Sequence, residues 1–224
     1  MPVASPLRGF HCTLLLVRLE RASRGPFAAQ AKPLSLLNIR WFMRRRLPFQ
    51  TDTHAAIGTA AGDFSAAVVL DLETGLQCAE LLARWPLHRF AEELARLGHR
   101  FNDALIAVER NNQGHAILYA LAHQLGYPRI YRHADSDGLS KPGWPMNAQT
   151  KPQAITGLER MVRDAPQAFA SARLLEQCRS YVYHQDGETG ARPGEHDDLV
   201  IAMAIALAVR KQGGAVRLLA ANRG

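Results

Sequence analysis

The stretch Gly194-Glu-His-Asp-Asp-Leu-Val-Ile-Ala-Met-Ala-Ile-Ala-Leu-Ala-Val209 decides how this chain folds. It predicts a helix that begins at residue 195 or 196, continues to Lys211 and is apolar on every side after its first turn. Such a helix is buried, so we expect it to lie against a sheet rather than on the surface. Its first turn, which carries Asp197 and Asp198, is then expected at the edge of the core.

A second stretch, Ala104-Leu-Ile-Ala-Val-Glu-Arg-Asn-Asn-Gln-Gly-His115, begins with a short apolar run that is typical of a buried strand. Glu109 is the first residue after that run, and open α/β sheets place their sites at the carboxyl ends of strands. Acids that meet at the edge of a core are costly unless a positive charge lies between them, usually a divalent cation. The two stretches therefore predict a metal site with Glu109, Asp197 and Asp198 as ligands.

Each of these acids also has a simpler interpretation. Glu109 can be a solvated strand end, with Asn112 as the cap of the next helix. Asp197 and Asp198 can cap exposed N–H groups at the positive end of their helix. The buried helix behind them favours a functional role, because its first turn does not face open water. We expect His196 to orient a carboxylate or contact a phosphate, because oxygen ligands suit Mg²⁺ and Mn²⁺ better than imidazole does.

The remaining patterns describe an α/β domain with a mixed sheet. We expect a hairpin (63–71 and 76–82), a helix (86–97), the strand 104–108, a helix (114–125) and a brief strand (129–131). A long loop (133–150), a helix (151–162), a helix or strand (172–182) and a turn-rich connection (187–194) follow. This order is also the one expected of the ribonuclease H-like fold, in which a parallel strand carries one acid and a late helix another.

The net charge of +7 comes from the N-terminal fifth of the 224 residues, because residues 1–50 hold nine Lys and Arg side chains against the single acid Glu20. This segment is either an arm that contacts nucleic acid or an anionic membrane, or a poorly ordered extension. We divide the chain into a basic extension (1–50), a folded domain (51–213) and a C-terminal tail (214–224).

Other patterns exclude several classes of protein. The three cysteines match no zinc or disulfide spacing, which predicts reduced thiols in an intracellular protein. No apolar run reaches the roughly 20 residues of a membrane span, so we expect no membrane insertion. The sequence contains no G-x-x-x-x-G-K-[S/T] motif, so no P-loop ATPase is expected in this chain.

Taken in order, the motifs resemble the nuclease domain of the large terminase subunit of tailed bacteriophages. The likeness covers about residues 55–210 and is carried by 63–75, 101–105, 108–115, 125–128 with Tyr131, 143–144, 150–152 and 194–202. It implies a ribonuclease H-like fold and an endonuclease that cuts double-stranded viral DNA during genome packaging, using two Mg²⁺ or Mn²⁺ ions. It also implies the portal protein, the small terminase subunit and a separate ATPase as partners, in the cytoplasm of a bacterial host.

By this resemblance, Glu109 matches the family's second acid and the Asp197-Asp198 pair the third, with Asp197 preferred and Asp198 in reserve. The family's first acid lies in a pattern like Ile-Gly-x-Asp-x-Ala-x-Gly, whereas this chain has Ala56-Ile-Gly-Thr-Ala-Ala-Gly-Asp63. Asp63 is therefore the candidate replacement for the first acid. The departure keeps an alternative open, namely a catalytically impaired prophage remnant that acts as a DNA-binding or assembly module.

The candidate contacts to the DNA backbone are basic or polar residues near these acids. They are Arg110, Asn112, Lys141, Lys151, Arg192 and His196.

Overall fold

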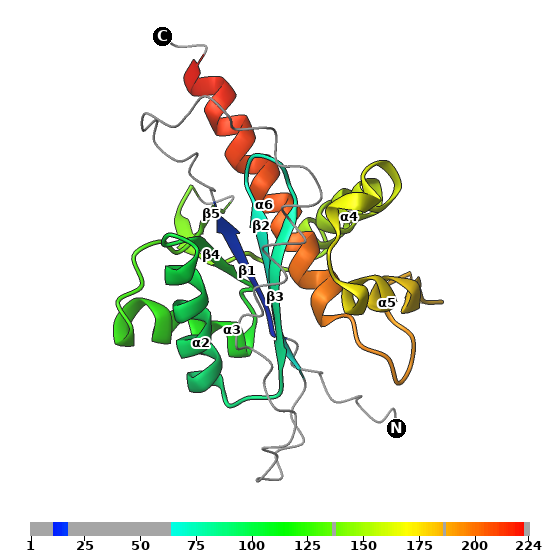
Figure 1. Cartoon of the computed structure of the whole chain (residues 1–224), viewed down its shortest axis with the longest axis horizontal. Helices are drawn as coiled ribbons and strands as arrows, with labels where there is room; N and C mark the ends of the chain where they lie inside the picture. The colour runs from blue at the N-terminus through cyan, green and yellow to red at the C-terminus, as the bar shows by residue number, and fades with distance from the viewer. Residues whose placement is uncertain (1–10, 18–63, 136–137, 186, 222–224) are drawn as a thin grey trace, which may run out of the picture. The chain divides into compact units, whose positions relative to one another are not determined.

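The computed structural model describes residues 11–17, 64–135, 138–185 and 187–221 (Figure 1). All of them belong to one unit of the chain, and the second unit, Glu20–Ala61, lies outside the described residues. Asp63, the candidate first acid, also lies outside them. Within the described ranges, no helix combines the length and the apolar character that crossing a membrane requires.

The predicted hairpin is present as strands β2 (Ser65–Asp71) and β3 (Gln77–Ala83), which pair antiparallel. Asp71 closes the turn, because its Oδ1 accepts hydrogen bonds from the Thr74 backbone N–H at 2.7 Å and from Thr74 Oγ1 at 2.6 Å. Its carboxylate is therefore used by the turn, as expected for an acid in this position.

Strand β1 (His11–Val17) lies between β2 and β4 (Leu105–Val108) in a four-stranded sheet of order β3-β2-β1-β4. It runs parallel to β2 and antiparallel to β4. Strand β1 lies in the segment expected to be a basic extension, so it is an element that the sequence did not predict. Its partners, β2 and β4, lie about 50 and 90 residues further along the chain, so no local pattern indicates this pairing.

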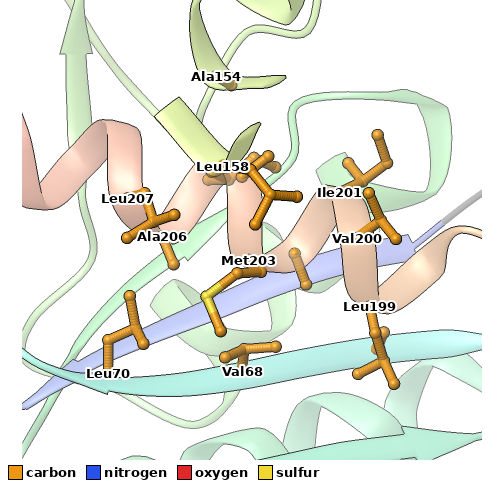
Figure 2. Packing of buried hydrophobic residues seen from close by; sticks show 14 of the residues in the cluster. Val68, Leu70, Ala154, Leu158, Leu199, Val200, Ile201, Met203, Ala206 and Leu207 are labelled. Atoms are coloured by element: carbon orange, nitrogen blue, oxygen red, sulfur yellow. The ribbon is translucent and has the colours of Figure 1, made fainter. Parts of the chain in front are cut away.

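One face of the sheet is covered by α6 (Asp198–Ala221), and α4 (Thr150–Asp164) packs on α6. Alternate residues of β2 point to this face, as the period of a strand requires. Figure 2 shows Val68 and Leu70 of β2 facing Leu199 and Met203 of α6, with Leu158 of α4 packed on the helix. The apolar stretch 199–209 is buried almost completely, which confirms that it lies against a sheet.

The opposite face of the sheet is covered by α2 (Leu87–Arg100) and α3 (Asn112–Tyr119). The intervening residues of β2, Ala67 and Val69, pack here in a second apolar cluster together with Phe90 of α2. The described elements therefore form a mixed α/β arrangement with helices on both faces of the sheet (Figure 1). This confirms the predicted fold class at the level of a mixed α/β domain.

Short elements complete the unit. They are the π-helical turn η2 (Ala120–Gln124), the hairpin β5 (Arg132–Ala134) and β6 (Ser140–Pro142), η3 (Pro166–Ala168), α5 (Ala172–Ser180), and the hairpin β7 (Tyr181–Tyr183) and β8 (Thr189–Ala191). Part of the predicted loop 133–150 is thus a hairpin. The segment predicted as helix or strand is a helix followed by a strand.

Helix α6 begins at Asp198 and continues to Ala221, across most of the segment predicted as a C-terminal tail. The residues after the Gly213-Gly214 pair are mostly Ala and Leu, which are strong helix formers, so the helix tolerates the two glycines. The helix therefore begins two to three residues later than predicted and continues beyond Lys211, where the sequence pattern ended it.

Candidate functional site

Glu109 follows strand β4 directly, where its backbone pairs with the segment that contains Trp144. Trp144 donates its N–H to Val108 O at 2.7 Å, and Arg110 donates its N–H to Trp144 O at 2.7 Å. Glu109 forms an isolated parallel bridge with Trp144, whereas β4 itself is antiparallel to β1. The carboxyl group is thereby fixed at the end of a buried strand, as the sequence predicted.

A tight turn then leads from Glu109 into α3. Asn111 is the N-cap, because its Oδ1 accepts a hydrogen bond from Gly114 N at 2.7 Å. A Cβ atom at Gly114 would lie 1.8 Å from Glu109 O, so only glycine fits there. The expected cap at Asn112 is wrong by one residue, since Asn112 is the first residue of the helix.

Asp197 lies immediately before α6, and its backbone carbonyl accepts the hydrogen bond of Ile201 N at 2.9 Å. Its Oδ2 accepts a hydrogen bond from Ala191 N of β8 at 3.2 Å. Its Oδ1 is buried and has no hydrogen-bond partner among the described residues, and the same holds for Glu109 Oε2. Two acids from a strand end and a helix start thus each present one unsatisfied oxygen.

Both acids line one pocket of about 380 Å³. Its walls come from the end of β4, the start of α4, the hairpin β7–β8 and the start of α6, with Glu109, Met146, Lys151, His184, Thr189, Gly190, Ala191, Arg192, Pro193, Glu195, Asp197 and Ile201 as lining residues. Segments that are almost 90 residues apart in the sequence, at Glu109 and Asp197, therefore meet in one cavity, as the sequence analysis expected.

The electrostatics of this pocket favour a bound positive charge. The pKa of Glu109 is raised from 4.5 to about 7, chiefly by burial and also by the negative charges of Asp197 and Asp198, against the lowering effects of the Asn111 hydrogen bond and of Lys151. Burial also raises the pKa of Asp197, against the hydrogen bond from Ala191 and the charge of Lys151. The charged form of each acid is thus disfavoured in the absence of a further cation.

Asp198 differs from Asp197 in its surroundings. Its side chain is 0% exposed and is absent from the residues that line the pocket. His196 Nδ1 lies 3.8 Å from Asp198 Oδ2, and the His196 ring packs edge-on against Phe64 at 4.9 Å. The expectation that His196 orients a carboxylate fits this geometry, and Asp197 is the acid of the pair that faces the pocket.

Two of the predicted phosphate contacts, Lys151 and Arg192, line the pocket beside the acids. Lys151 Nζ donates a hydrogen bond to Thr189 O at 2.8 Å and lies 3.3 Å from Glu188 Oε2. A cation at the start of α4 is thereby held close to both unsatisfied carboxylates.

The other predicted contacts lie elsewhere. Arg110 and Lys141 both pair with Asp135, at 2.8 and 3.1 Å, and hold the pKa of Asp135 at about 2. These ion pairs fasten the hairpin β5–β6 to the residue after Glu109, and neither cation lines the pocket. The side chain of Asn112 is not among those the structure describes.

Two chemically capable residues of the pocket, Glu195 and His184, were not predicted from the sequence. Glu195 stands in the quoted stretch beside Asp197, so its proximity was a usable signal. His184 comes from the turn-rich connection, and only the pairing of β7 with β8 brings it to the pocket. No local pattern in the sequence predicts that pairing.

The donor set fits a hard divalent cation. Carboxylate oxygens are the preferred ligands of Mg²⁺ and Mn²⁺, and Glu109 Oε2 and Asp197 Oδ1 are buried without partners in the described part of the chain. The described residues contain no group of three or more His, Cys, Asp or Glu side chains arranged to hold a metal ion. The fit therefore rests on the facing pair Glu109 and Asp197.

No model of a known protein family matches the sequence, and a search of the curated proteins gives no match either.

Proposed function

We propose that this chain is a metal-dependent endonuclease that cuts double-stranded DNA, with a ribonuclease H-like fold of the type found in the nuclease domain of large terminase subunits. The observation that carries the proposal is the pair Glu109 and Asp197, two buried acids that face one pocket with an unsatisfied oxygen each. Buried polar atoms are nearly always hydrogen-bonded, so two carboxylate oxygens without partners at one pocket support a bound cation there.

Glu109 and Asp197 are the residues that would hold Mg²⁺ or Mn²⁺, whereas Asp198 is 0% exposed and does not line the pocket. When bound, such ions activate a water molecule and stabilise the leaving oxygen of a phosphodiester. Asp63 remains the candidate for a further acid and lies outside the described residues.

The chain itself contributes the binding of the phosphate. Lys151 and Arg192 line the same pocket as the two acids, so a phosphate group that enters it meets positive charge. Contacts of this kind fix the position of the DNA backbone and carry no base specificity. Such contacts support a nuclease that cuts DNA with little dependence on base sequence.

The test is cleavage of supercoiled plasmid in the presence of Mn²⁺, comparing the parent chain with Glu109→Ala and Asp197→Ala. The proposal predicts nicking and linearisation by the parent and loss of both in each variant, with Lys141→Met as a control that changes a cation outside the pocket. Circular dichroism establishes that each sample is folded.

A folded parent chain that binds DNA without cutting it would overturn the nuclease and leave a DNA-binding module. Cleavage that survives both substitutions would also contradict the proposal, since it would come from another site or from a contaminating nuclease.

A further inference from the structure

The start of α6 is capped in an unusual way. Asp197 occupies the N-cap position, because its carbonyl accepts the first hydrogen bond of the helix, from Ile201 N at 2.9 Å. An Asp at this position ordinarily accepts an N–H of its own helix with its carboxylate. Here Oδ2 instead accepts from Ala191 N at 3.2 Å, and Oδ1 has no partner among the described residues.

Gln177 of α5 supplies the cap that Asp197 does not. Its Oε1 accepts a hydrogen bond from Leu199 N at 2.8 Å. This N–H is one of those that an Asp at residue 197 would normally satisfy. Leu199 is completely buried, so its N–H needs an acceptor from within the protein.

The helix that carries Gln177 is itself held in place at its start. Ser171 Oγ accepts a hydrogen bond from Leu174 N at 2.9 Å and caps α5. Gln77 Oε1 of β3 accepts from Ala170 N at 3.0 Å and from Ser171 N at 3.2 Å. Gln177 is therefore presented to α6 by an element that is anchored to the sheet.

We propose that Gln177 is a positioning residue for the metal site: it caps α6 in place of Asp197 and so leaves the Asp197 carboxylate facing the pocket. The inference rests on the proposed function in so far as the carboxylate is a metal ligand. Without Gln177, we expect the carboxylate of Asp197, which occupies the N-cap position, to accept the Leu199 N–H and to turn away from the pocket.

The test uses the whole chain with Gln177→Met, which keeps the side-chain length and removes the acceptor. We expect the dissociation constant for Mn²⁺, measured by calorimetry, to rise by about 10-fold or more. The melting temperature without metal should change little, because Asp197 takes over the cap. Gln177→Glu keeps an acceptor oxygen and should bind Mn²⁺ with an affinity close to that of the parent. Gln124→Met changes an exposed glutamine and should leave the Mn²⁺ affinity unchanged.

A second readout needs no metal. The carboxyl carbon of Asp197 is titrated by NMR in the parent chain and in Gln177→Met. We expect the titration of Asp197 to differ in the variant, because its carboxylate exchanges the N–H of Ala191 for N–H groups of the helix.

A lower melting temperature in Gln177→Met, with unchanged Mn²⁺ affinity and an unchanged Asp197 titration, would overturn the inference and leave Gln177 a merely structural residue. If the folded parent chain binds no Mn²⁺ but the titration of Asp197 shifts in the variant, the capping exchange is supported and the proposed function fails.

Discussion

Glu109 places a carboxyl group at the end of a buried strand, where its pKa is raised from 4.5 to about 7, chiefly by burial. Between pH 4.5 and about pH 7, Glu109 is protonated in the folded chain and ionised in the unfolded chain. The free energy of unfolding therefore falls as the pH rises through this window. A shift of this size corresponds to about 3 kcal/mol, as an upper bound for one group.

Glu109→Gln removes the titrating group and keeps its size. In the presence of EDTA, we expect the variant to be more stable than the parent at pH 8, by up to about 3 kcal/mol, with the difference shrinking towards pH 4.5. Urea unfolding at a series of pH values measures this difference in the free energy of unfolding between the variant and the parent. Parallel stability curves for the two chains would show that Glu109 titrates normally and is not desolvated.

Asp197 and Asp198 are neighbours in the sequence with different surroundings, which allows their roles to be separated. Asp197→Asn removes a carboxylate that faces the pocket, so we expect Mn²⁺ affinity and plasmid cleavage to fall by at least roughly 100-fold. Asp198→Asn leaves both pocket acids in place and should retain measurable Mn²⁺ binding. Equal loss in the two variants would contradict the assignment of Asp197 as the ligand.

At the scale of elements, Lys151 joins the start of α4 to strand β8 through Thr189 O at 2.8 Å. Its charge also opposes the effect of burial on the pKa values of Glu109 and Asp197. In Lys151→Met we expect both pKa values to rise further, so that Mn²⁺ stabilises the chain only at a higher pH than in the parent.

Thermal unfolding with and without Mn²⁺, from pH 6 to pH 9, measures this shift for Lys151→Met. Lys141→Met is the matched control, since Lys141 pairs with Asp135 and does not line the pocket. If Mn²⁺ begins to raise the melting temperature at the same pH in Lys151→Met and in the parent, the charge of Lys151 does not affect the pKa values of Glu109 and Asp197.

The elements that the sequence predicted well are those whose burial is indicated by a local hydrophobic periodicity or by a continuous apolar run. The apolar stretch after Asp198 and the run before Glu109 placed both acids correctly at the ends of buried elements. The three-residue strands of β7–β8 have no such signal, because a strand this short is defined by its partner. His184 was therefore missed, although it lies in the same pocket as Asp197.

At the scale of the whole molecule, the most consequential difference from the sequence analysis is strand β1. It comes from the segment assigned to a basic extension, yet it separates β2 from β4 and pairs with both. Glu109 directly follows β4, so the position of this acid depends on a strand that is more than 90 residues earlier in the chain. A domain that begins at residue 51 lacks that strand.

Leu15 tests this dependence in the intact chain, because its backbone pairs with Val69 on one side and with Ile106 on the other. Leu15→Pro removes a ladder N–H and fixes φ in the middle of a central strand, which should cost about 3 kcal/mol or more. Leu15→Val keeps the N–H and has a high strand propensity, so it should unfold close to the parent in urea.

A chain that starts at residue 51 tests the same dependence by removing β1 entirely. Without β1, strands β2 and β4 each lose the neighbour that their backbone groups pair with, and the sheet divides between them. We expect this shorter chain to lack a cooperative unfolding transition and to bind no Mn²⁺, because Glu109 and Asp197 are no longer held across one pocket. If it instead unfolds cooperatively with the parent's stability, β1 is dispensable and the boundary predicted from the sequence is the correct one.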